Sequence, residues 1–348
     1  MSDPTIRDNE TVAAGLAAWW TAHHPIARNV EVIEVRRPAA GRSNETVLAT
    51  VVCNGESHPV ALRLPTVQPS FPTYDLGAQA AVQTALQANG IPAARPIAFE
   101  ADESWLGAPF LVMTAEPGRS FGDAPALDSW LAGAGEAVQR RVHDGFATLL
   151  AAVHHLDWRQ AGLHKVLRGS HGGLAAEVRW WLDYLNWAAD GNPHPRLQSL
   201  AQWCEANVPT SEPPLSLCWG DARVGNVLYD DHGDVTAALD WELATIGPAE
   251  MDVAWWFALD DLLSNLIGRT VPGFPNNETA QQNYEARLGR PLQDLGWHKI
   301  FVTLRTAAVT DRQARTAAAL GATYRGVNVD NNPVLAYGEQ LIDQCDNW

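Results

Sequence analysis

Three side chains with oxygen donor atoms stand in a fixed order in the second half of the chain. Asp221 and Asn226 are five positions apart, and Asp240 follows fourteen residues after Asn226. Phosphoryl transfer from ATP needs a carboxylate near the acceptor hydroxyl, together with an amide oxygen and a second carboxylate that hold Mg²⁺. The spacing therefore predicts Asp221 as the catalytic base and Asn226 and Asp240 as ligands of Mg²⁺.

Short apolar runs typical of strands surround these three residues. The runs are Leu215–Cys218, Val227–Tyr229 and Val235–Leu239. Turn-forming residues at 231–234 separate the last two runs, which predicts a hairpin. In this arrangement all three side chains come from adjacent strand ends, whereas two unrelated acidic turns are the alternative interpretation.

The pattern of elements predicts two parts. A chain of 348 residues is long for a single core. We expect an α+β protein with a strand-rich part at 1–115 and a helical part at 116–348. Strands are expected at 30–35, 46–53, 58–64, 95–100 and 109–114, and an Asn54-Gly55 turn joins the second to the third. Helices are expected at 10–23, 75–89, 137–155, 174–189, 196–206, 249–266, 277–287, 295–320 and 333–345.

Composition is typical of a water-soluble globular protein, with 46% hydrophobic and 18% charged residues. No apolar run approaches the roughly 20 residues of a membrane span, and the first residues lack a signal-peptide pattern. The four cysteines show no metal-binding spacing. We therefore expect reduced thiols and a cytoplasmic location, without a membrane partner.

The net charge of −16 argues against a nucleic-acid partner. Residues 1–115 hold 7 basic and 11 acidic residues, whereas residues 116–348 hold 17 and 29. Because an acidic surface attracts cations, a cationic small-molecule acceptor is one interpretation. Acidity that serves solubility alone is the other.

The segment Leu217–Asn226, followed by Asp240-Trp-Glu242, resembles the catalytic loop of the aminoglycoside phosphotransferase family. The resemblance covers roughly residues 30–320 and implies a two-lobed protein-kinase-like fold, with a small β-rich lobe carrying one main helix and a larger helical lobe. It implies ATP and Mg²⁺ as cofactors and transfer to a hydroxyl of a small molecule. The Leu-Arg-x-Pro sequence at 62–65 is similar to a branch related to kinase domains fused to acyl-CoA dehydrogenases.

The same resemblance implies roles for further residues. Arg63 takes the place of the strand lysine that holds the phosphates in protein kinases. Arg223 is placed to meet the γ-phosphate, with a local ion pair as the alternative. Asp252 matches an aspartate that fixes the backbone of the catalytic loop. The remaining nucleotide contacts are Gly41, Ser43 and Asn44 in a turn before a strand, and Met113, Thr114 and Ala115 at the base.

Two departures from the family pattern leave a nucleotide-binding pseudokinase as an alternative. Trp219 stands where the family usually has His, and an indole donates one hydrogen bond but accepts none. Gln79 stands where a Glu orients the phosphate-binding cation, and Asp75 is the only carboxylate nearby. Glu242 either contacts a second metal or caps the following segment.

The acceptor is the least defined part of the prediction. An aminoglycoside or other amino alcohol fits the acidic part of the chain, whereas the Leu-Arg-x-Pro feature favours a hydroxyacyl-CoA or another small alcohol. We expect the acceptor pocket near 120–135, 190–215 and 260–280, with Trp255 and Trp256 in its wall. The adjacent pair His154-His155 is not expected to bind metal, because neighbouring helical residues point to different faces.

Overall fold

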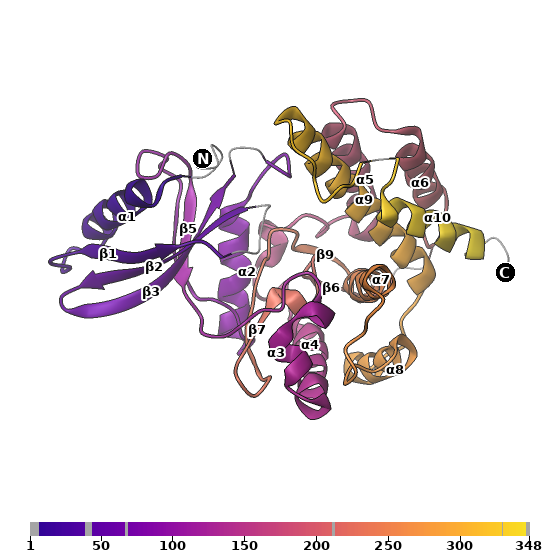
Figure 1. Ribbon diagram of the computed structural model, residues 1–348, viewed down its shortest axis with the longest axis horizontal. Helices are drawn as coiled ribbons and strands as arrows, with labels where there is room; N and C mark the ends of the chain where they lie inside the picture. The colour runs from indigo at the N-terminus through magenta and orange to yellow at the C-terminus, as the bar shows by residue number, and fades with distance from the viewer. Residues whose placement is uncertain (1–6, 39–43, 67–68, 211–212, 329, 346–348) are drawn as a thin grey trace. The chain divides into compact units, whose positions relative to one another are not determined.

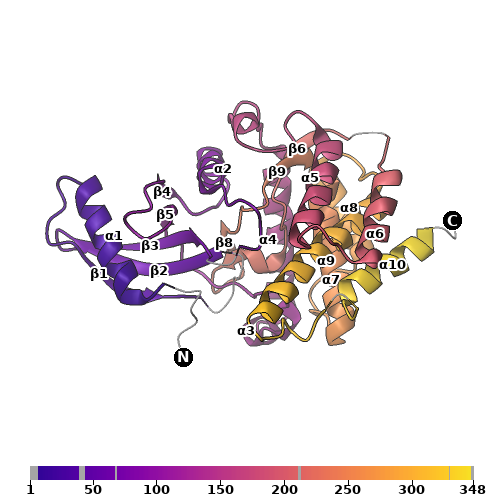
Figure 2. The ribbon, with the colours of Figure 1, turned by 90° about the horizontal axis from the view of Figure 1, so that it is seen from above.

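The computed structural model describes residues 7–38, 44–66, 69–210, 213–328 and 330–345. The chain divides into two units, Met1–Pro117 and Gly118–Trp348. Figures 1 and 2 show the course of the chain through the strand-rich first unit and the helical second unit.

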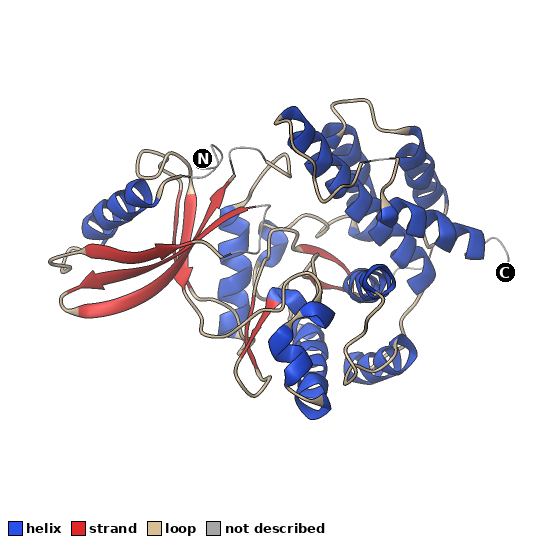
Figure 3. Ribbon diagram, viewed as in Figure 1, coloured by secondary structure: helices blue, strands red, loops and turns tan. Residues whose placement is uncertain are grey.

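The first unit is built on an antiparallel sheet of five strands in the order β1-β2-β3-β5-β4 (Figure 3). The strands are β1 (Glu31–Arg36), β2 (Asn44–Cys53), β3 (Glu56–Pro65), β4 (Pro96–Glu100) and β5 (Phe110–Thr114). Asn54 and Gly55 join β2 to β3 with φ angles of 54° and 81°, which are the positive values that a tight hairpin turn needs. This turn was predicted from its sequence.

Helices α1 (Asn9–His23) and α2 (Leu76–Ala88) pack against different faces of this sheet. Leu16 and Trp19 of α1 share a core cluster with Phe110 and Val112 of β5. Leu76 of α2 shares another cluster with Leu111 and Met113 of the same strand. Since alternate residues of a strand point to opposite faces, the two helices cover opposite sides of the sheet.

The second unit is mainly helical. It contains α3 (Ser129–Gly133), α4 (Glu136–His155), α5 (Gly173–Ala188), α6 (Pro195–Ala206), α7 (Glu250–Ile267), α8 (Asn277–Leu288), α9 (Leu295–Ala319) and α10 (Pro333–Cys345), with short 3₁₀ turns η1 (Pro125–Leu127), η2 (Leu163–Lys165) and η3 (Val224–Asn226). Four short strands form two antiparallel pairs. Strand β6 (Leu215–Cys218) pairs with β9 (Thr245–Pro248), and β7 (Val227–Tyr229) pairs with β8 (Val235–Ala238).

Each strand and helix that the sequence predicts is found within a few residues of its expected bounds. Strand β9 and the short helix α3 were not predicted. Strand β9 contains Gly247 and Pro248 and is only four residues long, so it carries too few residues for a recognisable alternation. Among the described helices, none combines the length and the apolarity that crossing a membrane requires.

Candidate active site

The two strand pairs of the second unit bring Asp221, Asn226 and Asp240 together. Asp221 lies in the loop that follows β6, Asn226 ends the turn η3, and Asp240 follows β8. The main-chain N–H of Leu239 donates to the carbonyl oxygen of Asn226 at 2.8 Å, which ties the end of β8 to the loop that carries Asp221. The hairpin inferred from the sequence therefore joins the three residues as expected.

The Asp221 carboxylate is held by donors on both oxygens. The indole N–H of Trp255 donates to Oδ1 at 2.7 Å, and the amide of Asn226 donates to Oδ2 at 2.7 Å. Arg223 approaches the same carboxylate at 3.2 Å. Burial raises the pKa of Asp221, the attraction of Arg223 opposes that rise, and the negative charge of Asp240 adds to it.

Asn226 is oriented so that its amide oxygen is the atom left for a cation. Its amide nitrogen donates to the carbonyl and to the carboxylate of Asp221, at 2.9 and 2.7 Å. Asp240 adopts a left-handed conformation with φ of 63°, which is uncommon for a residue with a side chain. An amide oxygen and a carboxylate suit a hard divalent cation, and such a cation would offset the repulsion between Asp221 and Asp240. The residues present therefore fit Mg²⁺.

Arg223 lies between two carboxylates. It donates to Asp123 and pairs with Asp221, while Arg325 donates to the other oxygen of Asp123 at 2.6 Å. Burial alone would raise the pKa of Asp123, but the ion pairs with Arg223 and Arg325 outweigh it and hold that pKa at about 2. The local ion pair that the sequence left as an alternative for Arg223 is present, and contact with a phosphate remains a prediction.

Trp219, which departs from the family pattern, links the two halves of the site. Its indole N–H lies 2.8 Å from the carbonyl oxygen of Leu239 and 3.1 Å from that of Asp240. The ring is fully buried and stacks on Trp241 at a centroid distance of 4.8 Å. The single donor of the indole is therefore used to anchor the segment that carries Asp240.

Asp252 fixes the backbone of the loop that carries Asp221, as the resemblance implied. Its carboxylate accepts the main-chain N–H groups of Trp219 at 2.6 Å and Gly220 at 2.8 Å. His154 lies 2.9 Å from the same carboxylate through Nε2, and its Nδ1 contacts the hydroxyl of Tyr284. Because this network already uses every one of these polar groups, a structural role accounts for Asp252.

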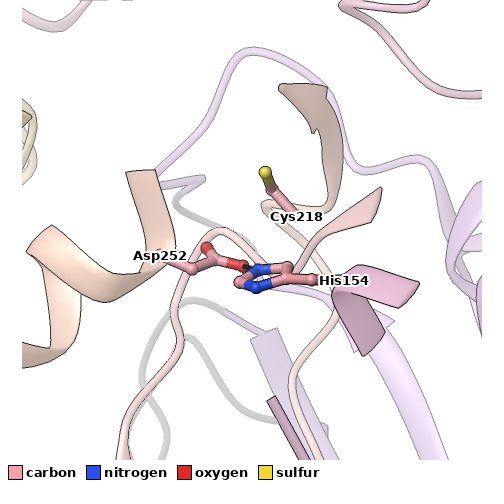
Figure 4. Close-up of side chains that lie close together, drawn as sticks. All are labelled: His154, Cys218 and Asp252. Carbon is pink, nitrogen blue, oxygen red and sulfur yellow. Dashed lines mark hydrogen bonds and ion pairs between the residues drawn. The ribbon is translucent and has the colours of Figure 1, made fainter. Parts of the chain in front are cut away.

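Figure 4 shows His154 and Asp252 in contact, with Cys218 nearby. Their donor atoms all lie within 4.8 Å of one another, a grouping that could hold a metal. Both ring nitrogens of His154 have hydrogen-bonding partners, however, and the thiol of Cys218 donates to the carbonyl of Pro248 at 3.3 Å. Burial also raises the pKa of Cys218, which disfavours the thiolate that a metal needs. We interpret the cluster as a hydrogen-bonded core.

Arg305 of α9 is a site residue that sequence reasoning missed. It is fully buried and donates through Nη2 to the carbonyl of Gly220 at 2.9 Å. Its guanidinium lies over the rings of Trp255 and Trp181, at 4.6 and 4.8 Å from their centroids. Arg305 therefore contacts both the residue before Asp221 and the tryptophan that donates to Asp221. The sequence around Arg305 contains no local pattern that indicates a contact with Gly220.

The nucleotide contacts predicted in the first unit are only partly described. Gly41 and Ser43 lie outside the described residues. Asn44 is buried at the start of β2, and Arg63 lies on β3 opposite Thr46 of β2. Asp75 accepts the main-chain N–H of Ala78 at 2.8 Å as the N-cap of α2, and Gln79 is buried on that helix. The roles proposed for Asn44 and Arg63 remain predictions.

The segment predicted to hold the base has its N–H groups engaged within the first unit. The N–H of Thr114 donates to the carbonyl of Arg95 at 2.9 Å, and that of Ala115 donates to Pro59 at 3.1 Å. The contact of these backbone groups with a base remains a prediction. Met113 is buried in the core beside α2, which is the usual environment of a methionine.

Trp255 and Trp256, which were expected to line one acceptor pocket, face different surroundings. Trp255 contacts Asp221, whereas Trp256 lines a separate cavity of about 480 Å³. Residues from the expected segments 120–135 and 260–280 line that cavity, and none from 190–215 does. Neither Asp221 nor Trp255 is among its lining residues. Adjacent helical residues differ by about 100° in direction, so the two indoles face different surroundings, and their place in the wall of an acceptor pocket remains a prediction.

Comparisons with known proteins identify the family of the chain. The model of the phosphotransferase enzyme family APH matches residues 34–273. Acyl-CoA dehydrogenase family member 11 of Gallus gallus is 31% identical over 225 residues, which are 64% of this chain and 27% of that protein. The human protein of the same name is 31% identical over 174 residues, covering 50% of this chain and 21% of the relative. The chain thus spans about a quarter of the length of the curated relatives that it matches.

Solved structures show the same fold. A protein of Ralstonia eutropha assigned to the aminoglycoside phosphotransferases has a TM-score of 0.65 at 23% identity, covering 96% of this chain and 94% of that one. An aminoglycoside-3′-phosphotransferase of type VIII has a TM-score of 0.56 at 19% identity, covering 84% and 98%. These likenesses confirm the kinase-like α+β fold, and the family match extends over more than half of the sequence. The chain belongs to the APH phosphotransferase enzyme family.

Proposed function

We propose that this chain transfers the γ-phosphate of ATP to a hydroxyl group of a small molecule, with Mg²⁺ as cofactor. The observation that carries the proposal is the Asp221 carboxylate, which Trp255 and Asn226 hold from two sides at 2.7 Å each. A base fixed in this way is positioned before the acceptor arrives, which removes part of the entropic barrier to reaction. The match to the phosphotransferase family supports the same class of chemistry.

Asp221 would accept the proton of the acceptor hydroxyl. The raised pKa of this carboxyl, caused by burial and by Asp240 against the opposing charge of Arg223, increases its affinity for that proton. Asn226 and Asp240 would hold Mg²⁺ through oxygen. When bound, the ion supplies positive charge that orients and neutralises phosphate oxygens. Arg223 would offer a guanidinium to the transferred group while Asp123 keeps it in place.

The first unit would bind the nucleotide. The proposed contacts there are the turn with Gly41, Ser43 and Asn44, the Arg63 guanidinium for phosphates, and the main chain of Thr114 and Ala115 with Met113 for the base. A solved structure of an aminoglycoside phosphotransferase from Streptomyces rimosus, with a TM-score of 0.50 to this chain, contains ADP and streptomycin. That neighbour supports nucleotide use.

Two acceptor classes are tested by the same assay. An amino alcohol of the aminoglycoside type is favoured by the acidic composition of residues 116–348. A hydroxyacyl-CoA ester is favoured by the relatives named as acyl-CoA dehydrogenase family members. We further propose a cytoplasmic protein without a nucleic-acid partner. The buried free thiols of Cys53, Cys204 and Cys218 support the location, and the net charge of −16 supports the absence of that partner.

The test is acceptor-dependent ADP release with Mg²⁺, measured for the wild type beside Asp240→Asn and Asp221→Asn. We expect one acceptor class to stimulate ADP release, and both variants to lose it. Asp221→Asn should keep its affinity for Mg·ATP, while its turnover falls by about 10²–10⁴-fold because only the proton acceptor is lost.

Binding of Mg·ATP without turnover on either acceptor class would favour the pseudokinase alternative. Absence of Mg·ATP binding would refute the assignments of Arg63 and Asp240 together. Equal loss of binding and turnover in Asp221→Asn would show that Asp221 has a structural role instead.

A further inference from the structure

The cavity beside Trp256 is large enough to hold a small molecule and is separate from the site around Asp221. Its volume of about 480 Å³ lies within the usual range of ligand pockets. Its wall is formed by the segment after Asp123, by α4, by the C-terminal half of α7 and by the loop that leads into α8. All of these elements belong to the second unit.

A carboxylate in this wall lacks a cationic partner. The Oδ2 atom of Asp260 accepts the indole N–H of Trp256 at 2.9 Å, and within the described residues its other oxygen accepts no hydrogen bond. Burial raises the pKa of Asp260 to about 7, the bond from Trp256 opposes that rise, and the charge of Asp261 adds to it. A positively charged ligand would compensate the charge of this half-buried carboxylate.

A second polar group in the wall is His143. This residue is 3% exposed, and its Nδ1 makes no hydrogen bond within the described part of the chain, with Asp144 as the nearest carboxylate at 3.8 Å. Burial lowers its pKa to about 4 even though Asp144 lies 3.8 Å away. The ring is therefore neutral near pH 7 and offers one nitrogen as an acceptor to a donor in the cavity.

Aromatic rings surround these acceptors. The ring of His143 lies 5.1 Å from Trp256 and 5.2 Å from Phe274, measured between centroids. Such a wall favours a cation through the negative faces of its rings, and it favours an apolar body by exclusion of water. Hydrogen-bond acceptors, one half-buried carboxylate and aromatic faces together describe a receptor for an organic ammonium ion.

Other charged groups near Asp260 are already engaged or lie at the surface. Asp261 accepts from Asn277 at 2.6 Å and lies 3.6 Å from Lys299. Arg269 lines the cavity but is exposed. Tyr229 is buried, and the charge of Asp260 contributes after burial to the rise of its pKa. The charge available to a ligand in the cavity is therefore that of Asp260.

We propose that this cavity binds a small organic ammonium ion with an apolar or aromatic body, with Asp260 as its counter-ion. The site is distinct from the place of phosphoryl transfer, so its occupation does not depend on the function proposed above. The ammonium would donate to Asp260 and to His143, while its body would lie against Trp256 and Phe274.

The probe is benzylamine, with benzyl alcohol as its neutral analogue, in the absence of ATP and Mg²⁺. Binding is measured by isothermal titration calorimetry at about pH 8.5, where Asp260 is ionised. We expect benzylamine to bind to the wild type and to Asp190→Asn, a variant of an exposed carboxylate. Asp260→Asn should weaken binding by about tenfold or more, because the ion pair with the ammonium is lost.

Two further experiments distinguish loss of the binding site from loss of folding. Ala126→Trp places a large ring in the cavity wall and should abolish binding while circular dichroism stays unchanged. Lowering the pH from about 8.5 to about 6 should weaken binding to the wild type as Asp260 is protonated, and should leave the residual binding to Asp260→Asn unchanged.

The proposal is overturned if benzyl alcohol binds as tightly as benzylamine, if Asp260→Asn binds benzylamine as tightly as the wild type, or if no binding is detected. The binding assay contains neither ATP nor a phosphate acceptor. A negative result would therefore not bear on the proposed phosphotransferase activity.

Discussion

The indole N–H of Trp219 donates to the main-chain carbonyl of Leu239 at 2.8 Å. This bond connects the loop that carries Asp221 to the strand end that carries Asp240. A tryptophan in place of the usual histidine is therefore compatible with an assembled site, because the ring supplies the donor that the position requires.

Trp219→Phe should loosen the segment that carries Asp240. The ring is largely retained, but the carbonyls of Leu239 and Asp240 lose their donor, at a cost of about 1 kcal/mol. We expect the Mg²⁺ concentration for half-maximal turnover to rise several-fold. Trp241→Phe is the matched control, since Trp241 stacks on Trp219 and its own N–H lies 3.4 Å from an acceptor. An equal change in both variants would attribute the effect to packing.

Arg305→Met should lower kcat without a matching change in the KM for ATP. The variant removes the donor to the Gly220 carbonyl and the cation over Trp255, which itself holds Asp221. We expect a fall of about tenfold in kcat, equivalent to roughly 1.4 kcal/mol. Arg305→Lys keeps a charge and a donor and should recover part of the rate. Steady-state kinetics with varied ATP make the measurement, and a purely structural role would lower stability without this recovery.

Gly220→Ala should be far more damaging than an alanine at a comparable open glycine. Gly220 has a φ of 87°, and an added Cβ would lie 2.2 Å from the carbonyl oxygen of Leu243. Gly191 has a φ of 78° with open space around it. Gly191→Ala should cost about 1 kcal/mol of unfolding free energy from backbone strain. Similar urea midpoints for the two variants would show that the loop relaxes freely.

Stability should fall as the pH decreases from about 6.5 to about 4, in part because of His298. Burial lowers the pKa of this histidine to about 4, so the unfolded chain binds its proton first. The contribution of His298 is therefore complete above the unfolded pKa and is lost as the pH falls. His298→Gln should reduce the slope of unfolding free energy against pH, by up to about 1.4 kcal/mol per pH unit. The exposed His155→Gln serves as control in the same urea titrations.

Periodicity and turn residues predicted most elements and the grouping of Asp221, Asn226 and Asp240, because these depend on local sequence and on one short hairpin. Residues that join the site from distant helices could not be predicted in the same way. Arg305 lies in a long helix and reaches Gly220 across 85 positions of sequence. The contacts of Trp255 with Asp221 and of Trp256 with Asp260 likewise depend on tertiary packing, which the adjacency of the two residues in sequence does not reveal.

The indole N–H of Trp219, which anchors the segment with Asp240, does not titrate. An indole stays neutral over the whole range in which proteins fold, whereas a histidine in its place changes charge near neutral pH. The bond from this ring to Leu239 and Asp240 therefore does not depend on a titration of its donor. A rate profile of this protein against pH should thus report on its carboxylates and its acceptor, with one fewer ionisation than a relative that carries the histidine.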